Sequence, residues 1–150
     1  VQEDQLKFEA ERPSIYEMDM HLGMMLNKVK QFQPDIVIID PINAFITVNS
    51  EIEFKAMLMR MVDFLKANNI TVLLTSLNIV DSALEQTDLA ISSLIDTWLL
   101  LREIDASGKR NRGISILKSR GMAHSNQIHL FLITDQGVDL EDVWVGTGGI

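Results

Sequence analysis

Two short runs rich in aliphatic residues, Ile36 to Ile39 and Ile70 to Thr75, lie on either side of a stretch with helical periodicity. Each run is nearly continuously apolar, which predicts a strand that is buried on both of its faces. A strand, a helix and a second strand in this order indicate a right-handed crossover between parallel strands. The expected fold class is therefore α/β, with a parallel sheet flanked by helices.

Two amphipathic helices are predicted from apolar residues that recur at steps of three and four. The first follows a capping-box pattern at Ser14 to Glu17 and stops at Pro34, which cannot continue a helix. The second follows the same spacing at Ser50 to Glu53 and ends at about Asn68-Asn69. The apolar positions are Met18, Leu22, Met25, Val29 and Phe32 in the first helix, and Phe54, Leu58, Met61 and Leu65 in the second.

The second half of the sequence predicts strands joined by turns, after a polar segment that could form a helix. The strands are rich in aliphatic residues, and clusters of Asp, Ser and Gly separate them. We expect the last two strands to pair in the antiparallel sense and the tail to be a truncated linker. The helix-capable segment is 82–94, the strands are 97–101, 113–119 and 130–134, the turns are 105–109 and 135–137, and the linker is 146–150.

The composition indicates a globular domain of 150 residues, with 47% hydrophobic and 23% charged residues. The net charge of -8 repels a phosphate backbone, which argues against general binding to nucleic acid. The sequence has no cysteine, which excludes disulfides and is compatible with a reducing cytoplasm. Its apolar runs are far shorter than the roughly 20 residues of a membrane helix. Because no signal peptide opens the sequence and its first residue is Val, we expect a cytoplasmic fragment of a longer protein.

An acidic residue follows the first strand, at the position where open α/β sheets bind their ligands. Asp40 comes directly after Ile39, so its carboxylate should emerge at the carboxyl edge of a parallel sheet. Mg²⁺ bound to a nucleotide triphosphate takes few protein ligands, so one Asp suffices. The next strand ends in the segment Thr75 to Asn78, whose polar side chains, Ser76 and Asn78 above all, would sense the terminal phosphate. In the alternative interpretation Asp40 caps the turn that begins at Pro41, and the later polar residues belong to an ordinary strand-to-loop transition.

Cationic side chains lie at the end of the predicted strand 113–119. Alternation with a period of two should place Lys118 and Arg120 on one face, where the strand leaves the core. Arg offers a planar fork for phosphate oxygens and Lys a point charge, while Gly121 permits a sharp turn that brings His124 round. The alternative is a solvated strand end with two surface cations. The face expected to carry them consists of Ile114, Ile116, Lys118 and Arg120.

The sequence contains neither a phosphate loop nor a histidine pattern typical of a metal site. The pattern Gly-x-x-x-x-Gly-Lys-Ser/Thr occurs nowhere in the 150 residues. We therefore expect the chain to be the C-terminal portion of a nucleotide-hydrolysing domain whose phosphate loop lies upstream of Val1. His21 and His129 have no ligand-like spacing to one another or to carboxylate pairs, so we interpret them as structural.

Four segments carry a more specific pattern: Pro34 to Pro41, Leu94 to Arg102, Ile116 to His124 and Phe131 to Gly137. In this order they resemble successive signatures of the KaiC family of circadian clock ATPases and autokinases. The most specific piece is the Lys-x-Arg-Gly-x-x-His element, which ends at His124. The similarity spans roughly residues 12–149, and the shared order of the segments argues against chance.

The resemblance implies a RecA-like P-loop NTPase core with C-terminal antiparallel strands, assembled as a hexameric ring that holds ATP at each subunit interface. It implies that Asp40 is the Walker B acid, which interacts with Mg²⁺. It also implies that Lys118, Arg120 and His124 reach the nucleotide of the neighbouring subunit. Regulatory partners similar to KaiB are a further implication. On this basis residues 1–145 are the C-terminal portion of one such domain, and the phosphate loop and catalytic glutamates precede them.

The same resemblance implies candidate phosphorylation sites shortly before Asp96 and Thr97. In the autokinase half of KaiC, a Ser-Thr pair lies three residues before the corresponding Asp-Thr, and another Thr lies a few residues earlier. Ser92 and Ser93 match the pair, and Thr87 matches the earlier position. The alternative is that these are unmodified residues on a helix surface.

Three functions remain open from the sequence. The first is a KaiC-like ring protein with ATPase activity and, as an open question, Ser/Thr autokinase activity. A recombinase or helicase relative would need cationic or aromatic loops that bind DNA, whereas residues 77–93 contain acidic residues and no Lys, Arg or aromatic residue. The third function is a non-catalytic oligomerisation or signalling module that lacks the phosphate loop, and the upstream sequence would separate it from an ATPase.

Overall fold

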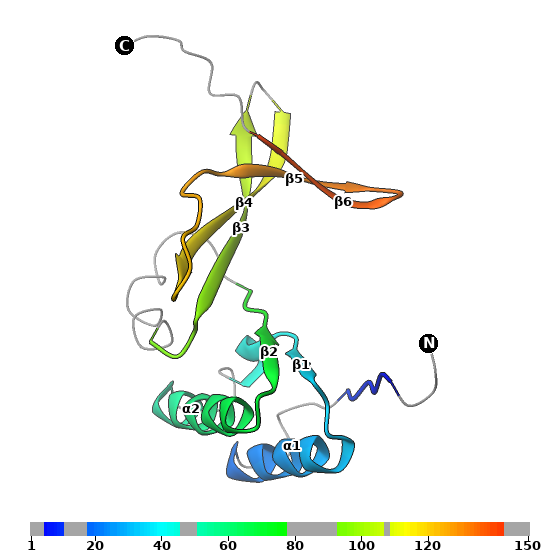
Figure 1. The fold of residues 1–150 in the computed structure, drawn as a ribbon, viewed down its shortest axis with the longest axis vertical. Helices are drawn as coiled ribbons and strands as arrows, with labels where there is room; N and C mark the ends of the chain where they lie inside the picture. Colours follow the sequence, from blue (N-terminus) through cyan, green and yellow to red (C-terminus); the bar gives the residue numbers. More distant parts are fainter. Residues whose placement is uncertain (1–4, 11–17, 46–50, 78–92, 107–108, 143–150) are drawn as a thin grey trace. The chain divides into compact units, whose positions relative to one another are not determined.

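A computed structural model describes residues 5–10, 18–45, 51–77, 93–106 and 109–142. The chain divides into two compact units, Val1–Leu94 and Ile95–Ile150. The first unit contains a two-stranded sheet and the second a four-stranded sheet (Figure 1).

The first unit contains a strand, a helix and a second strand, preceded by another helix. Its two strands pair in parallel, with Ile36 opposite Thr71 and Ile39 opposite Leu74. This pairing confirms the parallel strand-helix-strand arrangement that the sequence predicts. The elements are α1 (Met18–Phe32), β1 (Ile36–Ile39), the 3-10 helix η2 (Ile42–Phe45), α2 (Glu51–Ala67) and β2 (Thr71–Leu74).

Both helices end close to the positions that the sequence predicts. α1 ends at Phe32, and Gln33 then has a φ of 51° just before Pro34. After α2, Asn69 has a φ of 57°, a left-handed conformation that Asn tolerates better than most residues. The predicted capping boxes involve residues 14–17 and Ser50, which lie outside the described residues. Among the residues that the structure describes, no helix has the length and apolar character needed to cross a membrane.

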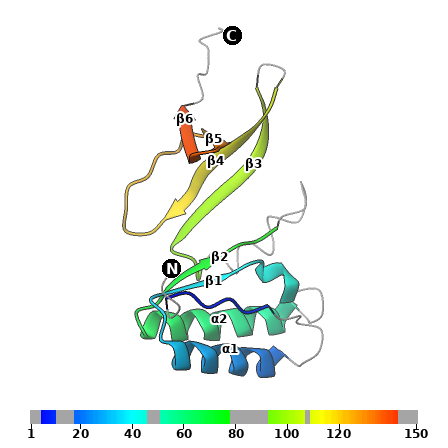
Figure 2. The same cartoon turned by 90° about the vertical axis from the view of Figure 1, so that its right-hand side faces the viewer.

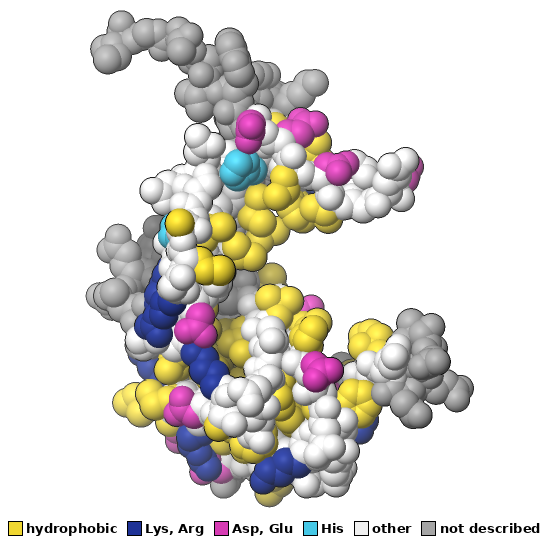
Figure 3. Space-filling model, viewed as in Figure 1, with side chains coloured by type: hydrophobic (Ala, Val, Ile, Leu, Met, Phe, Trp, Pro, Cys, Tyr) yellow, Lys and Arg dark blue, Asp and Glu magenta, His cyan; other side chains and the backbone are white. Residues whose placement is uncertain are grey.

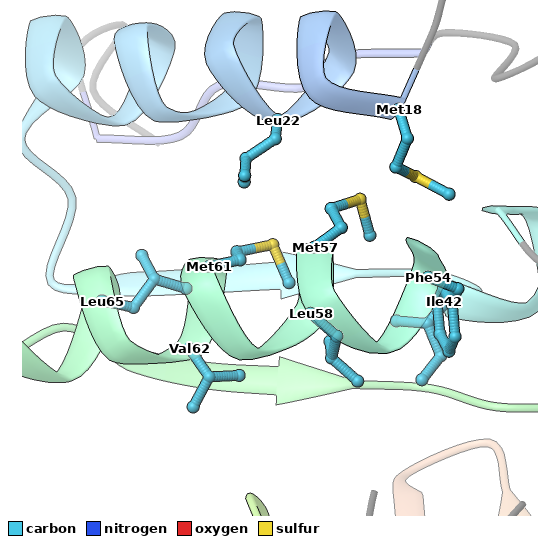
Figure 4. Close-up of a cluster of buried hydrophobic side chains, with 9 residues drawn as sticks. All are labelled: Met18, Leu22, Ile42, Phe54, Met57, Leu58, Met61, Val62 and Leu65. Carbon is cyan, nitrogen blue, oxygen red and sulfur yellow. The ribbon is translucent and has the colours of Figure 1, made fainter. Parts of the chain in front are cut away.

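The core of the first unit lies where α1 packs on α2, on one side of the β1–β2 sheet (Figures 2 and 4). Leu22 of α1 points toward Met57 and Met61 of α2 (Figure 4). Burying side chains of this size contributes about 1.5–3 kcal/mol each, so this packing stabilises the unit. Apart from Phe32, the predicted apolar positions of both helices belong to this core or pack against it. The buried cluster is Met18, Leu22, Ile42, Phe54, Met57, Leu58, Met61, Val62 and Leu65.

The opposite face of the β1–β2 sheet is exposed. Ile36, Ile38 and Leu73 have exposed fractions of 61%, 63% and 50%, whereas Val37 and Ile39 pack against the core. The prediction that both strands are buried on both faces is therefore wrong for this structure. The reason is that α1 and α2 cover the same face (Figure 2), so burial alternates along strands whose sequences are nearly continuously apolar.

The second unit is an antiparallel sheet of β3 (Thr97–Ala106), β4 (Lys109–Ser119), β5 (His129–Thr134) and β6 (Gly137–Asp142), in that order. The predicted antiparallel pairing of β4 with β5 is confirmed. β3 continues beyond the predicted end at Leu101, because its polar second half still pairs with β4. β6 is absent from the sequence prediction. Of the helix-capable segment 82–94, the structure describes Ser93 and Leu94, which lie in a turn.

A β-bulge interrupts the pairing of β3 with β4. Trp98 lies opposite Lys118 but Leu99 lies opposite Ile116, so Leu117 is an extra residue on β4. Because opposed residues share a face of the sheet, Lys118 and Ile116 lie on opposite faces. The predicted single face is therefore wrong, since the extra residue reverses the alternation. That prediction comprised Ile114, Ile116, Lys118 and Arg120.

Apolar side chains also gather on one face of the β5–β6 hairpin (Figure 3). Ile133 lies opposite Val138, and Phe131 lies opposite Leu140, so these four residues share a face. Val138 and Leu140 alternate with carboxylate residues along β6, which is the pattern of a strand with one apolar face. That alternation is the sequence signal from which β6 could have been predicted.

Candidate functional site

Asp40 lies at the carboxyl end of β1, beside the carboxyl end of β2. The Thr75 backbone N–H donates to the Ile39 carbonyl at 3.1 Å. The Thr75 hydroxyl donates a hydrogen bond to Oδ1 of the Asp40 carboxylate. Asp40 is exposed, so a ligand in solvent can reach it. The acid therefore lies at the expected edge of the sheet, where α/β proteins bind ligands.

Further hydrogen bonds join the loops that follow β1 and β2. The Ile42 N–H donates to the Thr75 carbonyl at 2.9 Å, and the Leu77 N–H donates to Oδ1 of Asn43 at 2.7 Å. Parallel neighbouring strands have their carboxyl ends at the same edge of the sheet. The loops that follow β1 and β2 therefore lie side by side, although they are distant in sequence, and these bonds connect them. The loop that carries the acid and the loop that carries the predicted phosphate sensors are thereby linked.

The carboxylate at this edge suits Mg²⁺, a hard cation that prefers oxygen ligands. Among the residues that the structure describes, no three His, Asp or Glu side chains gather closely enough to hold a metal ion. Mg²⁺ bound to a nucleotide takes most of its ligands from phosphate oxygens and water, so a single carboxylate is compatible with such a site. Ser76 is exposed at the same edge, whereas Asn78 lies outside the described residues.

Lys118 and Arg120 lie at the carboxyl end of β4, in the second unit. The Arg120 N–H donates to the Asp96 carbonyl at 2.8 Å, and its guanidinium Nη1 lies 3.8 Å from Asp96 Oδ1. The two side chains of this ion pair are 50% and 55% exposed, and such surface pairs contribute little to stability. A guanidinium presents five N–H donors in a planar fork, a geometry that suits carboxylate and phosphate oxygens.

The loop after β4 contains the predicted glycine turn and His124. Gly121 has a φ of 73°, a left-handed conformation that glycine adopts without steric cost. This confirms the sharp turn that the sequence predicts. His124 is half-buried, and its Nδ1 lies 3.2 Å from the Ser125 carbonyl oxygen.

The two histidines that the sequence assigns to structure have packing or ion contacts. His21 is buried on α1, and its ring meets the ring of Phe45 edge-on, with centroids 6.1 Å apart. His129 Nδ1 lies 3.0 Å from Asp142 Oδ1, across the β5–β6 hairpin. Both contacts agree with a structural interpretation of these residues.

Of the candidate phosphorylation sites, Ser93 is described and is exposed in the turn before β3. Ser92 and Thr87 lie outside the described residues. The structure adds Thr75 and Asn43 to the surroundings of the acid. The sequence offers only a weak signal for them, because each is a polar residue in a strand-end segment where such residues are common.

Comparisons with known proteins find the same family along nearly the whole chain. The family model "ATPase: KaiC" matches residues 2–142. "Circadian clock protein KaiC2" of Synechocystis sp. is 43% identical over 147 residues, which cover 97% of this chain and 26% of that protein. "Circadian clock protein KaiC3" of the same organism is 31% identical over 150 residues, which cover 99% of this chain and 30% of that protein.

A third relative extends the similarity to another organism. "Circadian clock oscillator protein KaiC" of Synechococcus elongatus is 30% identical over 140 residues, which cover 91% of this chain and 27% of that protein. The chain thus spans between a quarter and a third of the length of these relatives. Its parallel and antiparallel sheets are those of a RecA-like ATPase domain. The chain belongs to the KaiC family of ATPases.

Proposed function

We propose that this chain is part of a cytoplasmic ring protein that binds Mg-ATP between its subunits and hydrolyses it. The observation that carries the proposal is the exposed carboxylate of Asp40 at the carboxyl edge of a parallel sheet, in a chain of the KaiC family. An acid at this edge can order the water shell of Mg²⁺ while phosphate oxygens supply the other ligands. Mg²⁺ in turn neutralises charge that develops on the phosphoryl group.

In this proposal Lys118, Arg120 and His124 reach the nucleotide that is bound by the neighbouring subunit. Arg and Lys stabilise negative charge on a transferred phosphoryl group, and a residue supplied from a second subunit acts only when the ring is assembled. The Arg120 side chain is 50% exposed at the strand end, which supports this role because an exposed guanidinium is accessible to a nucleotide of a second subunit. Hydrolysis would therefore depend on assembly, which we propose to be a homohexamer.

The test is a pair of variants in the full-length protein. Arg120→Ala should lower ATP turnover by roughly 10³ or more, as removal of an arginine finger does. Arg110→Ala is the matched control, because Arg110 lies in β4 and also has an exposed acidic partner, Glu103 at 3.4 Å. It should leave turnover close to that of the wild type.

Mixing experiments test the contribution from the neighbouring subunit. Subunits with Arg120→Ala and subunits with Asp40→Asn are each expected to be inactive alone. Mixed rings contain some interfaces with both intact residues, so part of the activity should return. If rings that demonstrably exchange subunits stay as inactive as either parent, the two residues do not act on one nucleotide from opposite subunits.

We also propose autokinase activity directed at Ser92 or Ser93, with Thr87 as a further candidate. The exposed position of Ser93 supports this proposal. A phosphate would add about -1.5 to -2 charges near Asp96 and would reorganise this segment by repulsion. Fragment-ion mass spectrometry after incubation with Mg-ATP is expected to find the phosphate on one of these residues. A phosphate elsewhere, or none on a protein that hydrolyses ATP, would leave an ATPase without this kinase activity.

Regulatory proteins similar to KaiB are the partners we propose, because the relatives are named as circadian clock proteins. We propose no role in nucleic-acid binding, because the net charge is -8 and repels a phosphate backbone. Stimulation of ATP hydrolysis by single-stranded DNA would contradict this part of the proposal.

A further inference from the structure

The backbone of Thr75, at the carboxyl edge of the first sheet, is hydrogen-bonded through both its N–H group and its carbonyl group. Its N–H donates to the Ile39 carbonyl at 3.1 Å, and its carbonyl accepts from the Ile42 N–H at 2.9 Å. The two partners flank Asp40 in sequence, so the backbone of Thr75 is fixed against the segment that carries the acid. Thr is also β-branched, which restricts rotation about its χ1 angle. The hydroxyl therefore has few positions available relative to the carboxylate.

We propose that Thr75 is a positioning residue that orients the Asp40 carboxylate for magnesium, an inference that rests on the proposed role of Asp40. The Thr75 hydroxyl donates to Oδ1, which restricts rotation of the carboxylate and leaves Oδ2 to face the cation and its water shell. Partners that orient a ligand in this way typically change metal affinity or activity by 10–100-fold when they are removed. Thr75 itself touches neither metal nor nucleotide in this proposal.

Asn43 supports the same arrangement from the other loop. Its Oδ1 accepts the Leu77 N–H at 2.7 Å, two residues beyond Thr75. This bond ties the segment after β2 to η2, which begins two residues after Asp40. The strand end that carries the Thr75 hydroxyl is thereby kept beside the carboxylate.

The experiment measures cation binding in the full-length protein, with Mn²⁺ as the probe and ADP present. Electron paramagnetic resonance gives the Mn²⁺ dissociation constant without any need for hydrolysis. Thr75→Val removes the hydroxyl but keeps the β-branched shape, and it should raise this constant by about 10-fold or more. Thr75→Ser retains the hydroxyl and should restore most of the affinity.

Thr71→Val is the matched control, because Thr71 lies at the opposite end of the same strand and should leave Mn²⁺ affinity unchanged. Asn43→Ala provides a second test that leaves Thr75 in place, and it should weaken Mn²⁺ binding in the same direction. Circular dichroism during thermal unfolding confirms that each variant is folded. The split between kcat and KM gives a second readout: Thr75→Val should lower kcat at limiting Mg²⁺ more than it raises the KM for ATP.

The outcomes separate this inference from the proposed function. If Asp40→Asn weakens Mn²⁺ binding but Thr75→Val binds Mn²⁺ within about twofold of the wild type, well under the effect typical of lost orienting partners, Thr75 does not position the acid. If Asp40→Asn leaves Mn²⁺ binding unchanged, both the role of Asp40 and this inference are overturned. If the wild type binds Mn²⁺ with ADP but hydrolyses no ATP, the proposed hydrolysis fails while the Mn²⁺ constants still decide the role of Thr75.

Discussion

Gly113 is the residue of β4 at which neighbouring side chains leave no room for a methyl group. A Cβ at this position would lie 2.9 Å from Cγ2 of Ile128 and 3.3 Å from Cδ1 and Cγ2 of Ile104. These side chains would have to move, so we expect Gly113→Ala to lower the free energy of unfolding by about 1–3 kcal/mol. Calorimetry of the full-length protein should show the loss as a lower midpoint of thermal unfolding.

The control for this substitution is Gly23 on α1. No heavy atom lies within 4 Å of the position that its Cβ would occupy, and glycine inside a helix is less favourable than alanine by about 0.5–1 kcal/mol. Gly23→Ala should therefore raise the unfolding midpoint. If both substitutions raise it, the close approach at Gly113 does not constrain the sheet.

Individual site residues are predictable from the sequence only where they stand at a recognisable strand end. The position of Asp40 after four aliphatic residues and the turn at Gly121 are both confirmed. The partners Thr75 and Asn43 are not predictable in the same way. Thr75 is 35 residues from Asp40, and their contact depends on the register of two parallel strands, which a single sequence does not specify.

At the scale of elements, the long periodic segments are the most predictable. α1 and α2 follow their apolar stripes because both stripes pack into one core. The short strands β1 and β2 are also correctly predicted, but their burial is not, since it depends on which faces the helices cover. β3 shows the same difficulty, because pairing with β4 extends β-structure into polar residues.

The bulge in β4 is the element-scale feature that sequence patterns describe least well. Alternation with a period of two holds only where pairing is regular, and one unpaired residue reverses it. The residues Ile116, Leu117 and Lys118 contain no glycine that would signal an irregularity. The prediction of a single mixed face therefore failed at the point where the strand changes from apolar to cationic side chains.

At the scale of the whole chain, we expect the isolated 150 residues to bind ATP negligibly. The sequence contains Asp40 and the cationic strand end but no Gly-x-x-x-x-Gly-Lys-Ser/Thr. A phosphate loop holds the β-phosphate through several backbone N–H groups, and isolated charges do not replace them. Isothermal titration calorimetry with ATP and Mg²⁺ is the measurement. Magnesium-dependent binding at micromolar concentration would show that these residues suffice without a phosphate loop.

The bulge at Leu117 also affects how this chain can vary during evolution. Before the bulge, Ile114 and Ile116 lie on one face of the sheet, and after it Lys118 lies on the other. A substitution that repacks the isoleucine face leaves the surroundings of Lys118 unchanged, and a change of charge at the strand end does not alter the apolar side. In the proposed function Lys118 reaches a nucleotide, so selection for folding and selection for that proposed chemistry would act on separate halves of one strand.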